Sequence, residues 1–144
     1  AEEELRTLCR SLNIESSVAF LGFLEKPDLV EAYNASKIFV ITSTSDTQSL
    51  VMMQAMASGL PVIGVKAMAL PEYINRNNGI VVEPGNERML AKNIVYLLKH
   101  AQERKRLGSG GHSFAQKFSA QAISEAWEKI YEKTAREYNQ KNEA

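Results

Sequence analysis

Two patterns of hydrophobic residues alternate along the chain, and together they predict an α/β fold. Short apolar runs rich in β-branched residues are typical of strands buried on both faces of a parallel sheet. Between them, apolar residues recur at the three- and four-residue spacing of helices. The predicted strands cover residues 18–22, 37–41, 61–65 and 78–85. The main predicted helices cover residues 1–12, 27–34, 50–58, 87–100, 102–107 and 120–139. We therefore expect a Rossmann-like parallel sheet of about four strands, flanked by helices.

A polar loop between the second predicted strand and the third helix is the main candidate for a binding site. Residues 42–49 are almost entirely Ser, Thr, Asp and Gln, and they can cap the helix that follows. That helix is apolar nearly all round, which predicts that it is buried, and it stops at Gly59. A strand, helix and second strand form a right-handed crossover, whose ligand site lies at the carboxyl end of the first strand. Free N–H groups and the positive helix end favour a phosphate there.

The composition narrows the classes of function. Seventeen basic and seventeen acidic residues give a net charge of zero, so no nucleic-acid partner is expected. The single cysteine, Cys9, excludes an internal disulfide and suits a buried position in the first helix. No apolar run approaches the length of a membrane span and no signal peptide is evident, so we expect a cytoplasmic protein. His100 and His112 lack metal-ligand spacing, so no metal is expected. No cofactor is predicted either.

The stretch D-T-Q-S-L-V-M-M-Q-A-M-A-S-G-L-P-V-I, residues 46–63, resembles the donor-site signature of glycosyltransferase family 4. These enzymes are retaining glycosyltransferases of the GT-B fold, and the resemblance implies the C-terminal, donor-binding half of that fold. Their signature has two glutamates separated by seven residues, followed by Ala-Met-Ala, a small residue, Gly, any residue, Pro and Val. Here the two glutamate positions hold Asp46 and Gln54, and Ser49 stands where a glycine is usual.

The resemblance implies binding roles for several residues of this stretch. The first acid and its neighbour hold hydroxyls of the donor sugar, the backbone amides after them hold the diphosphate, and the second acid holds the ribose. The sugar contacts therefore fall on Asp46 and Thr47. The diphosphate contacts fall on Gln48, Ser49 and Leu50, and the ribose contact falls on Gln54. Asp46 is one methylene shorter than glutamate, and Gln54 keeps an acceptor without the charge. A charged hydrogen bond contributes about 1.5–3 kcal/mol and a neutral one about 1, so we expect weaker donor binding.

The resemblance extends on both sides of the signature. Before it, the family places Gly22 and Phe23 near the nucleotide base, and Gly22 also suits a tight turn with positive φ. After it, residues 67–70 lack the two glycines that usually precede Pro71 and Glu72, which removes backbone freedom near the sugar. Glu72 is either a ligand or an acid that stabilises the start of a short helix.

The domain organisation follows from the same comparison. Residues 1–118 are expected to form a nucleotide-sugar-binding domain without its first two strands, which would lie between the first and second predicted strands. We expect the four strands to close up or to pair with another copy through exposed edges. Residues 108–111 are interpreted as a flexible break and not as a phosphate loop. The last helix, within residues 119–144, carries an apolar stripe for packing on the core or on a partner domain. The stripe consists of Ile123, Trp127, Ile130, Tyr131 and Tyr138.

The function implied is transfer of a hexose from a nucleoside diphosphate sugar to an acceptor hydroxyl, with retained configuration. No catalytic side chain is assigned, because this class relies on positioning and on stabilising the departing diphosphate. The acceptor, and any membrane contact, would be held by an N-terminal domain absent from this chain, so the chain alone is expected to be inactive. Two alternatives remain. One is a degenerate or binding-only domain; the other is a different GT-B enzyme, either a sugar-nucleotide epimerase or a phosphorylase with Lys66 as its pyridoxal lysine.

Overall fold

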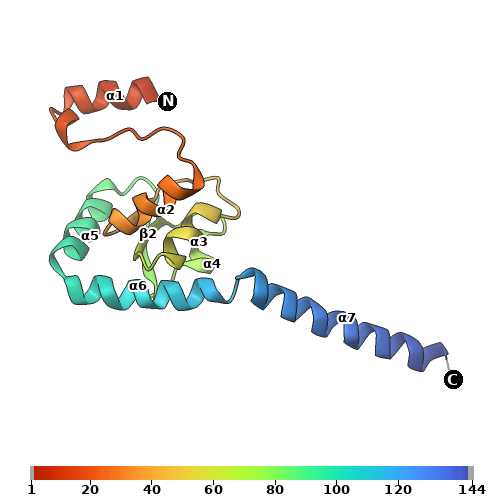
Figure 1. Ribbon diagram of the computed structural model, residues 1–144. Coiled ribbons are helices and arrows are strands. Elements are labelled where there is room, and N and C mark those ends of the chain that lie inside the picture. The colour runs from red at the N-terminus through yellow and green to blue at the C-terminus, as the bar shows by residue number, and fades with distance from the viewer. Residues whose placement is uncertain (1, 143–144) are drawn as a thin grey trace. The chain divides into compact units, whose positions relative to one another are not determined.

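The computed structural model describes residues 2–142, with side chains for residues 2–139. The chain divides into two compact units, Ala1–Glu31 and Ala32–Ala144. The first unit contains α1 (Glu2–Ser11), a 3₁₀ turn (Glu15–Ser17) and the start of α2 (Lys26–Ala35). The second contains the rest of α2 and all other elements, as Figure 1 shows. These are β1 (Phe39–Ile41), α3 (Leu50–Ala57), β2 (Val62–Val65), α4 (Leu70–Tyr73), β3 (Gly79–Val82), α5 (Glu87–Lys99), α6 (Ala101–Gln116) and α7 (Ala120–Asn142).

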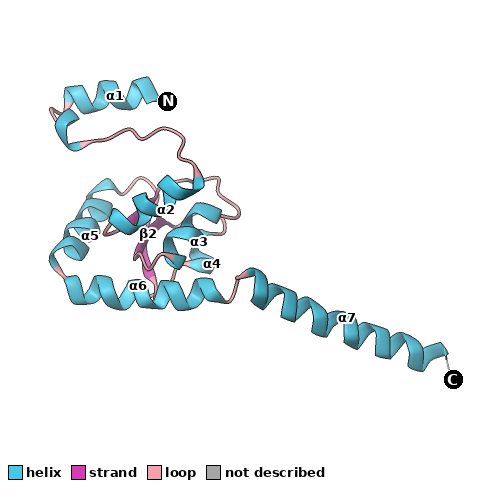
Figure 2. Ribbon diagram, viewed as in Figure 1, coloured by secondary structure: helices cyan, strands magenta, loops and turns pink. Residues whose placement is uncertain are grey.

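The second unit is built on a parallel sheet in the order β1-β2-β3. Figure 2 shows the strands in magenta, among the helices. Phe39 pairs with Val62, and Val62 pairs in turn with Gly79, so the carboxyl ends of the strands meet at one edge. Every residue of β2 is buried, as the continuous apolar pattern of this strand predicts for the centre of a parallel sheet. The α/β fold with a parallel sheet flanked by helices is thereby confirmed.

Three helices close the hydrophobic core around this sheet. α3, α5 and α6 each contact at least two strands, and α3 also packs along α6. Their buried side chains meet those of β2, which places the core between the sheet and these helices. The largest fully buried side chains are Met52, Met56, Ile63, Leu70, Leu97 and Leu107.

The prediction of a strand at residues 18–22 is wrong. This segment is irregular, and no strand of residues 2–142 pairs with it. A strand needs a neighbour to satisfy its N–H and C=O groups, and an apolar run cannot supply one. Val18 and Leu21 accordingly remain 38% and 61% exposed. The described sheet therefore has three strands instead of four, although Gly22 does take the expected positive φ of 65°.

The prediction of a flexible break at residues 108–111 is also wrong, because α6 runs through these residues without interruption. The reason is close packing. A Cβ atom on Gly108 would meet the carbonyl oxygen of Gly59, and one on Gly110 would meet that of Asn77. Glycine lowers helix propensity by about 1 kcal/mol, but here it lets the helix backbone approach two neighbouring turns.

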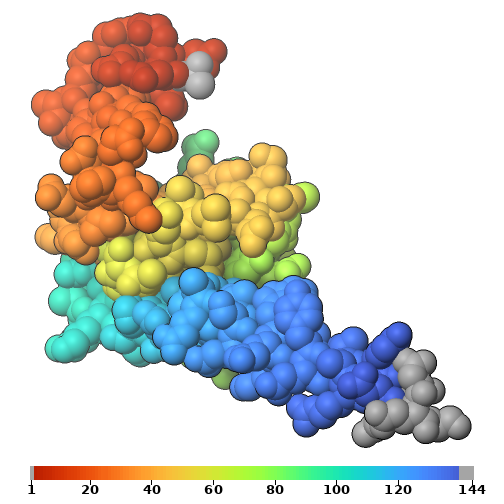
Figure 3. Space-filling view, turned by 45° about the vertical axis from the view of Figure 1, so that its right-hand side comes forward, coloured from red at the N-terminus to blue at the C-terminus, as the bar shows by residue number. Residues whose placement is uncertain are grey.

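Two predicted burials are only partly correct. α3 buries Met52, Ala55 and Met56, whereas Leu50 at its start is 67% exposed. The apolar stripe of α7 is not in the core of the described chain, because each of its side chains is exposed. Figure 3 shows α7, in blue, extending beyond the other elements of the second unit. Trp127 and Tyr131 stack on each other within it, with ring centroids 5.7 Å apart. Packing of this stripe on another domain stays a prediction.

Candidate functional site

The polar loop leads from the carboxyl end of β1 into the first turn of α3. Ser49 is the N-cap: its φ and ψ are −82° and 93°, and its buried Oγ accepts a hydrogen bond from the Met52 N–H at 3.4 Å. The N–H groups of Leu50 and Val51, at the first two helical positions, have no acceptor within the helix. The loop thus presents two free donors and the positive end of a helix at the edge where ligands of parallel sheets bind.

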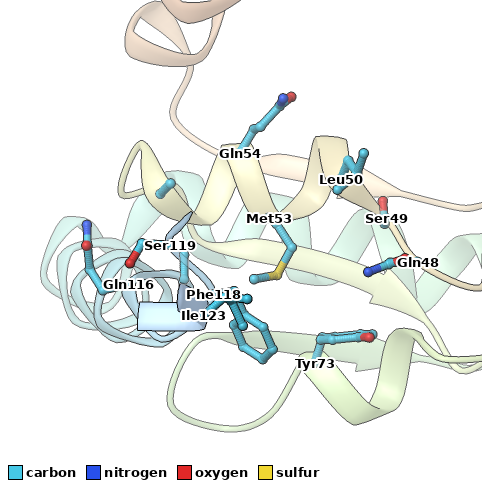
Figure 4. Close-up of a pocket in the computed structure, with 12 residues that line it drawn as sticks. Gln48, Ser49, Leu50, Met53, Gln54, Tyr73, Gln116, Phe118, Ser119 and Ile123 are labelled. Carbon is cyan, nitrogen blue, oxygen red and sulfur yellow. The ribbon is translucent and has the colours of Figure 1, made fainter. Parts of the chain in front are cut away.

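A pocket of about 520 Å³ opens beside this helix start (Figure 4). Its polar side is formed by Gln48 and Ser49, and Figure 4 shows the Gln48 side chain lying toward the pocket. Its apolar side comes from three separate elements, namely Met53 of α3, Tyr73 of α4 and the junction of α6 and α7. At that junction Phe118 packs edge-on against Tyr73, with ring centroids 6.3 Å apart. The pocket therefore joins a polar side to an apolar wall.

The predicted ribose contact faces a different direction. Gln54 lies on α3 next to Met53 and belongs to the lining of the pocket, but the end of its side chain points away from the other lining side chains (Figure 4). There it meets Tyr33 of α2, whose hydroxyl lies 3.4 Å from Gln54 Oε1 and donates a hydrogen bond to the Val51 carbonyl oxygen at 3.1 Å. Tyr33 is only 7% exposed, and this burial raises the pKa of its phenol. In the sequence, Tyr33 lies within the predicted helix at residues 27–34, and no motif marks its hydroxyl.

The predicted site residues are divided between the two units. Asp46 is half-buried in the loop, and Thr47 beside it is exposed. Both belong to the second unit with the helix start. Gly22 and Phe23 belong to the first unit, where the Phe23 side chain is exposed.

The loop after β2 departs from ordinary backbone geometry. Met68 has a φ of 45°, in the left-handed region that favours glycine.

Two charged residues near this loop have structural positions. Lys66 forms an exposed ion pair with Glu83, with Nζ and Oε1 3.0 Å apart. Glu72 lies in the first turn of α4, the position expected for a helix-stabilising acid.

Two further features bear on the kind of site. In the part of the chain that the structure describes, no three His, Cys, Asp or Glu side chains gather where they could hold a metal ion. Within residues 2–142, none of the helices has both the length and the apolar character needed to cross a bilayer.

Comparison with known proteins places the chain in one family. The family model "Glycosyl transferases group 1" matches residues 1–114. Among curated relatives, N-acetyl-alpha-D-glucosaminyl L-malate synthase of Bacillus anthracis is 29% identical over 126 residues, which cover 86% of this chain and 32% of that protein. The chain thus spans about a third of the length of this relative.

Solved structures give the same result. The C-terminal domain of a group 1 family glycosyl transferase, LpcC from Francisella tularensis, superimposes with a TM-score of 0.72 at 27% identity, covering 81% of this chain and 60% of that one. Alr3699/HepE of Anabaena, solved in complex with UDP, superimposes with a TM-score of 0.82 at 27% identity, covering 91% and 36%. The same Anabaena protein has also been solved with UDP-glucose.

Proposed function

The chain belongs to the group 1 glycosyl transferases, as the C-terminal domain of a GT-B fold, and from this premise we propose that its polar loop binds a nucleoside diphosphate sugar donor. The protein would transfer a hexose from this donor to an acceptor hydroxyl with retained configuration. The observation that carries the proposal is the start of α3, where two N–H groups without helical acceptors lie at the carboxyl end of β1.

Each part of the donor has a candidate partner in this arrangement. The diphosphate is assigned to the amides of Gln48, Ser49 and Leu50, where the helix end stabilises negative charge. Of these three, the Leu50 amide is one of the two N–H groups without a helical acceptor. That charge grows when the diphosphate departs, so the same groups would lower the barrier to transfer. Asp46 and Thr47 are assigned to hydroxyls of the sugar, and Gln54 to the ribose.

The choice of a nucleoside diphosphate hexose as the donor is supported by a related structure. Alr3699/HepE is solved with UDP and with UDP-glucose, and this chain superimposes on about a third of it. A nucleoside diphosphate hexose is therefore the first donor class to test. The acceptor, and the domain that would hold it, belong to the same proposal.

The experiment is a calorimetric titration of the intact protein with UDP, GDP and ADP sugars. Asp46→Ala and Gln54→Ala should each raise the Kd for one of these donors about fivefold or more, which corresponds to about 1 kcal/mol. Asp28→Ala in α2 and Gln102→Ala in α6 are matched controls, which should leave the Kd unchanged. Binding that neither site substitution weakens would place the donor elsewhere, and absence of binding would favour a degenerate domain.

A further inference from the structure

The side chain of Tyr33, which is buried, connects α2 to α3 through its hydroxyl. The ring is held edge-on against Phe39, with centroids 6.2 Å apart and planes at 64°. Its Oη lies 3.1 Å from the Val51 carbonyl oxygen and 3.4 Å from Gln54 Oε1. Because burial raises the pKa of this phenol, it carries its proton at neutral pH.

The contact of Tyr33 with Val51 and Gln54 has more acceptors than hydrogens. A phenol has one hydrogen to donate, but both of its neighbours here are oxygen acceptors. The nearer acceptor is a helix carbonyl, which cannot turn. The Gln54 amide can turn, and a half-turn exchanges Oε1 and Nε2 with little change in shape. Nε2–H then donates to Tyr33 Oη, Tyr33 donates to Val51, and each hydrogen has one acceptor.

We propose that Tyr33 is a positioning residue, which holds the Gln54 amide with its carbonyl oxygen turned toward the ligand. The end of the Gln54 side chain is exposed and points away from the other side chains that line the pocket, so an oxygen fixed there is accessible (Figure 4). Such an oxygen accepts a hydrogen bond from a hydroxyl, whereas a free amide presents its N–H₂ group as readily. This inference rests on the proposed function, which assigns Gln54 to the hydroxyls of a ribose, and adds Tyr33 as the residue that orients the Gln54 amide.

A double-mutant cycle on the intact protein tests whether Tyr33 acts through Gln54. The ligand is UDP, and the readout is the Kd at a temperature where every variant is folded. Tyr33→Phe should raise the Kd two- to fivefold. In a Gln54→Ala background the same substitution should have no further effect, because no amide remains to be oriented. Tyr96→Phe in α5 is the matched control and should leave the Kd unchanged.

Two further readouts separate positioning from a structural role. In a Gln54→Glu background, Tyr33→Phe should also be without effect, because both oxygens of a carboxylate are acceptors. With 2′-deoxy-UDP, the difference between wild type and Tyr33→Phe should shrink. The inference is overturned if Tyr33→Phe raises the Kd by the same factor in all three backgrounds. If the wild-type protein binds no UDP or other nucleotide sugar, the proposed function itself fails, and the inference fails with it.

Discussion

Replacing Gly110 by alanine tests why α6 continues through a glycine-rich stretch. A Cβ atom at this position would collide with the carbonyl oxygen of Asn77. That carbonyl belongs to a turn that is fixed from both sides, since the Asn77 N–H donates to Asn75 Oδ1 at 2.9 Å and the Asn78 N–H to the Asn75 carbonyl at 3.0 Å. The turn therefore cannot yield to the added methyl group without losing hydrogen bonds.

Gly111, the next residue of α6, is the matched control. A Cβ atom there would lie 3.4 Å from Met56 Cγ and 3.5 Å from the Leu60 carbonyl oxygen, which are ordinary contacts. Both substitutions bring the same gain in helix propensity, about 1 kcal/mol. Only Gly110→Ala adds an overpacking cost, typically about 1–3 kcal/mol and more where backbone must move.

The expected order of stability is therefore Gly111→Ala, wild type, Gly110→Ala. We expect Gly111→Ala to raise the free energy of unfolding by about 0.5–1 kcal/mol. Gly110→Ala should lower it by up to about 2 kcal/mol, because the overpacking cost exceeds the gain in helix propensity. Urea denaturation followed by far-ultraviolet circular dichroism resolves differences of this size. Equal stability of the two variants would refute the argument that close approach to Asn77 requires glycine.

Two other predictions concern stability. Met68→Gly should raise the free energy of unfolding by about 0.5–1 kcal/mol in thermal melts, because the left-handed φ costs a bulky residue more than glycine loses in entropy. Asn13→Gly, at a φ of 54° that asparagine tolerates, should give no gain, and a gain of equal size would contradict the strain argument. The hydrogen bond from Arg106 lowers the pKa of Glu103 from its ordinary value of 4.5, so this pair stabilises the fold above that pH and loses its effect as the pH falls below it. Glu103→Gln should therefore flatten the curve of stability against pH below 4.5, and an unchanged curve would exclude this contribution.

The elements that were predicted correctly are those fixed by local sequence. β2 and α3 each follow from a run of apolar residues bounded by Gly59, Pro61 or a capping serine. The segment at residues 18–22 has an equally apolar pattern, but a strand also requires a partner, which its own residues do not encode. The prediction of a flexible break at residues 108–111 is wrong for a related reason. The contact of Gly110 with Asn77 comes from 33 positions away in the chain.

Some parts of the candidate site could likewise be predicted from local sequence, and others could not. The polar loop, the cap at Ser49 and the free N–H groups of the first turn could be read from the order of residues alone. The apolar wall of the pocket could not, because Tyr73 and Phe118 meet only when α4 and the end of α6 have folded together. The role of the Tyr33 hydroxyl could not be read from the sequence either, because its contact with Gln54 comes from 21 positions away in the chain.

The measurement that tests the central claim most directly compares Leu50→Pro with Leu50→Ala in titrations with UDP and with uridine. Leu50 is the first residue of α3, where proline fits a helix, and Ser49 before it has the extended conformation that proline requires. Leu50→Pro therefore removes one N–H donor, whereas Leu50→Ala removes only the exposed side chain. If this helix start binds the diphosphate, Leu50→Pro should raise the Kd for UDP about tenfold, as expected for a hydrogen bond to a charged group, and leave uridine unaffected. An equal Kd for UDP in the two variants would contradict the account.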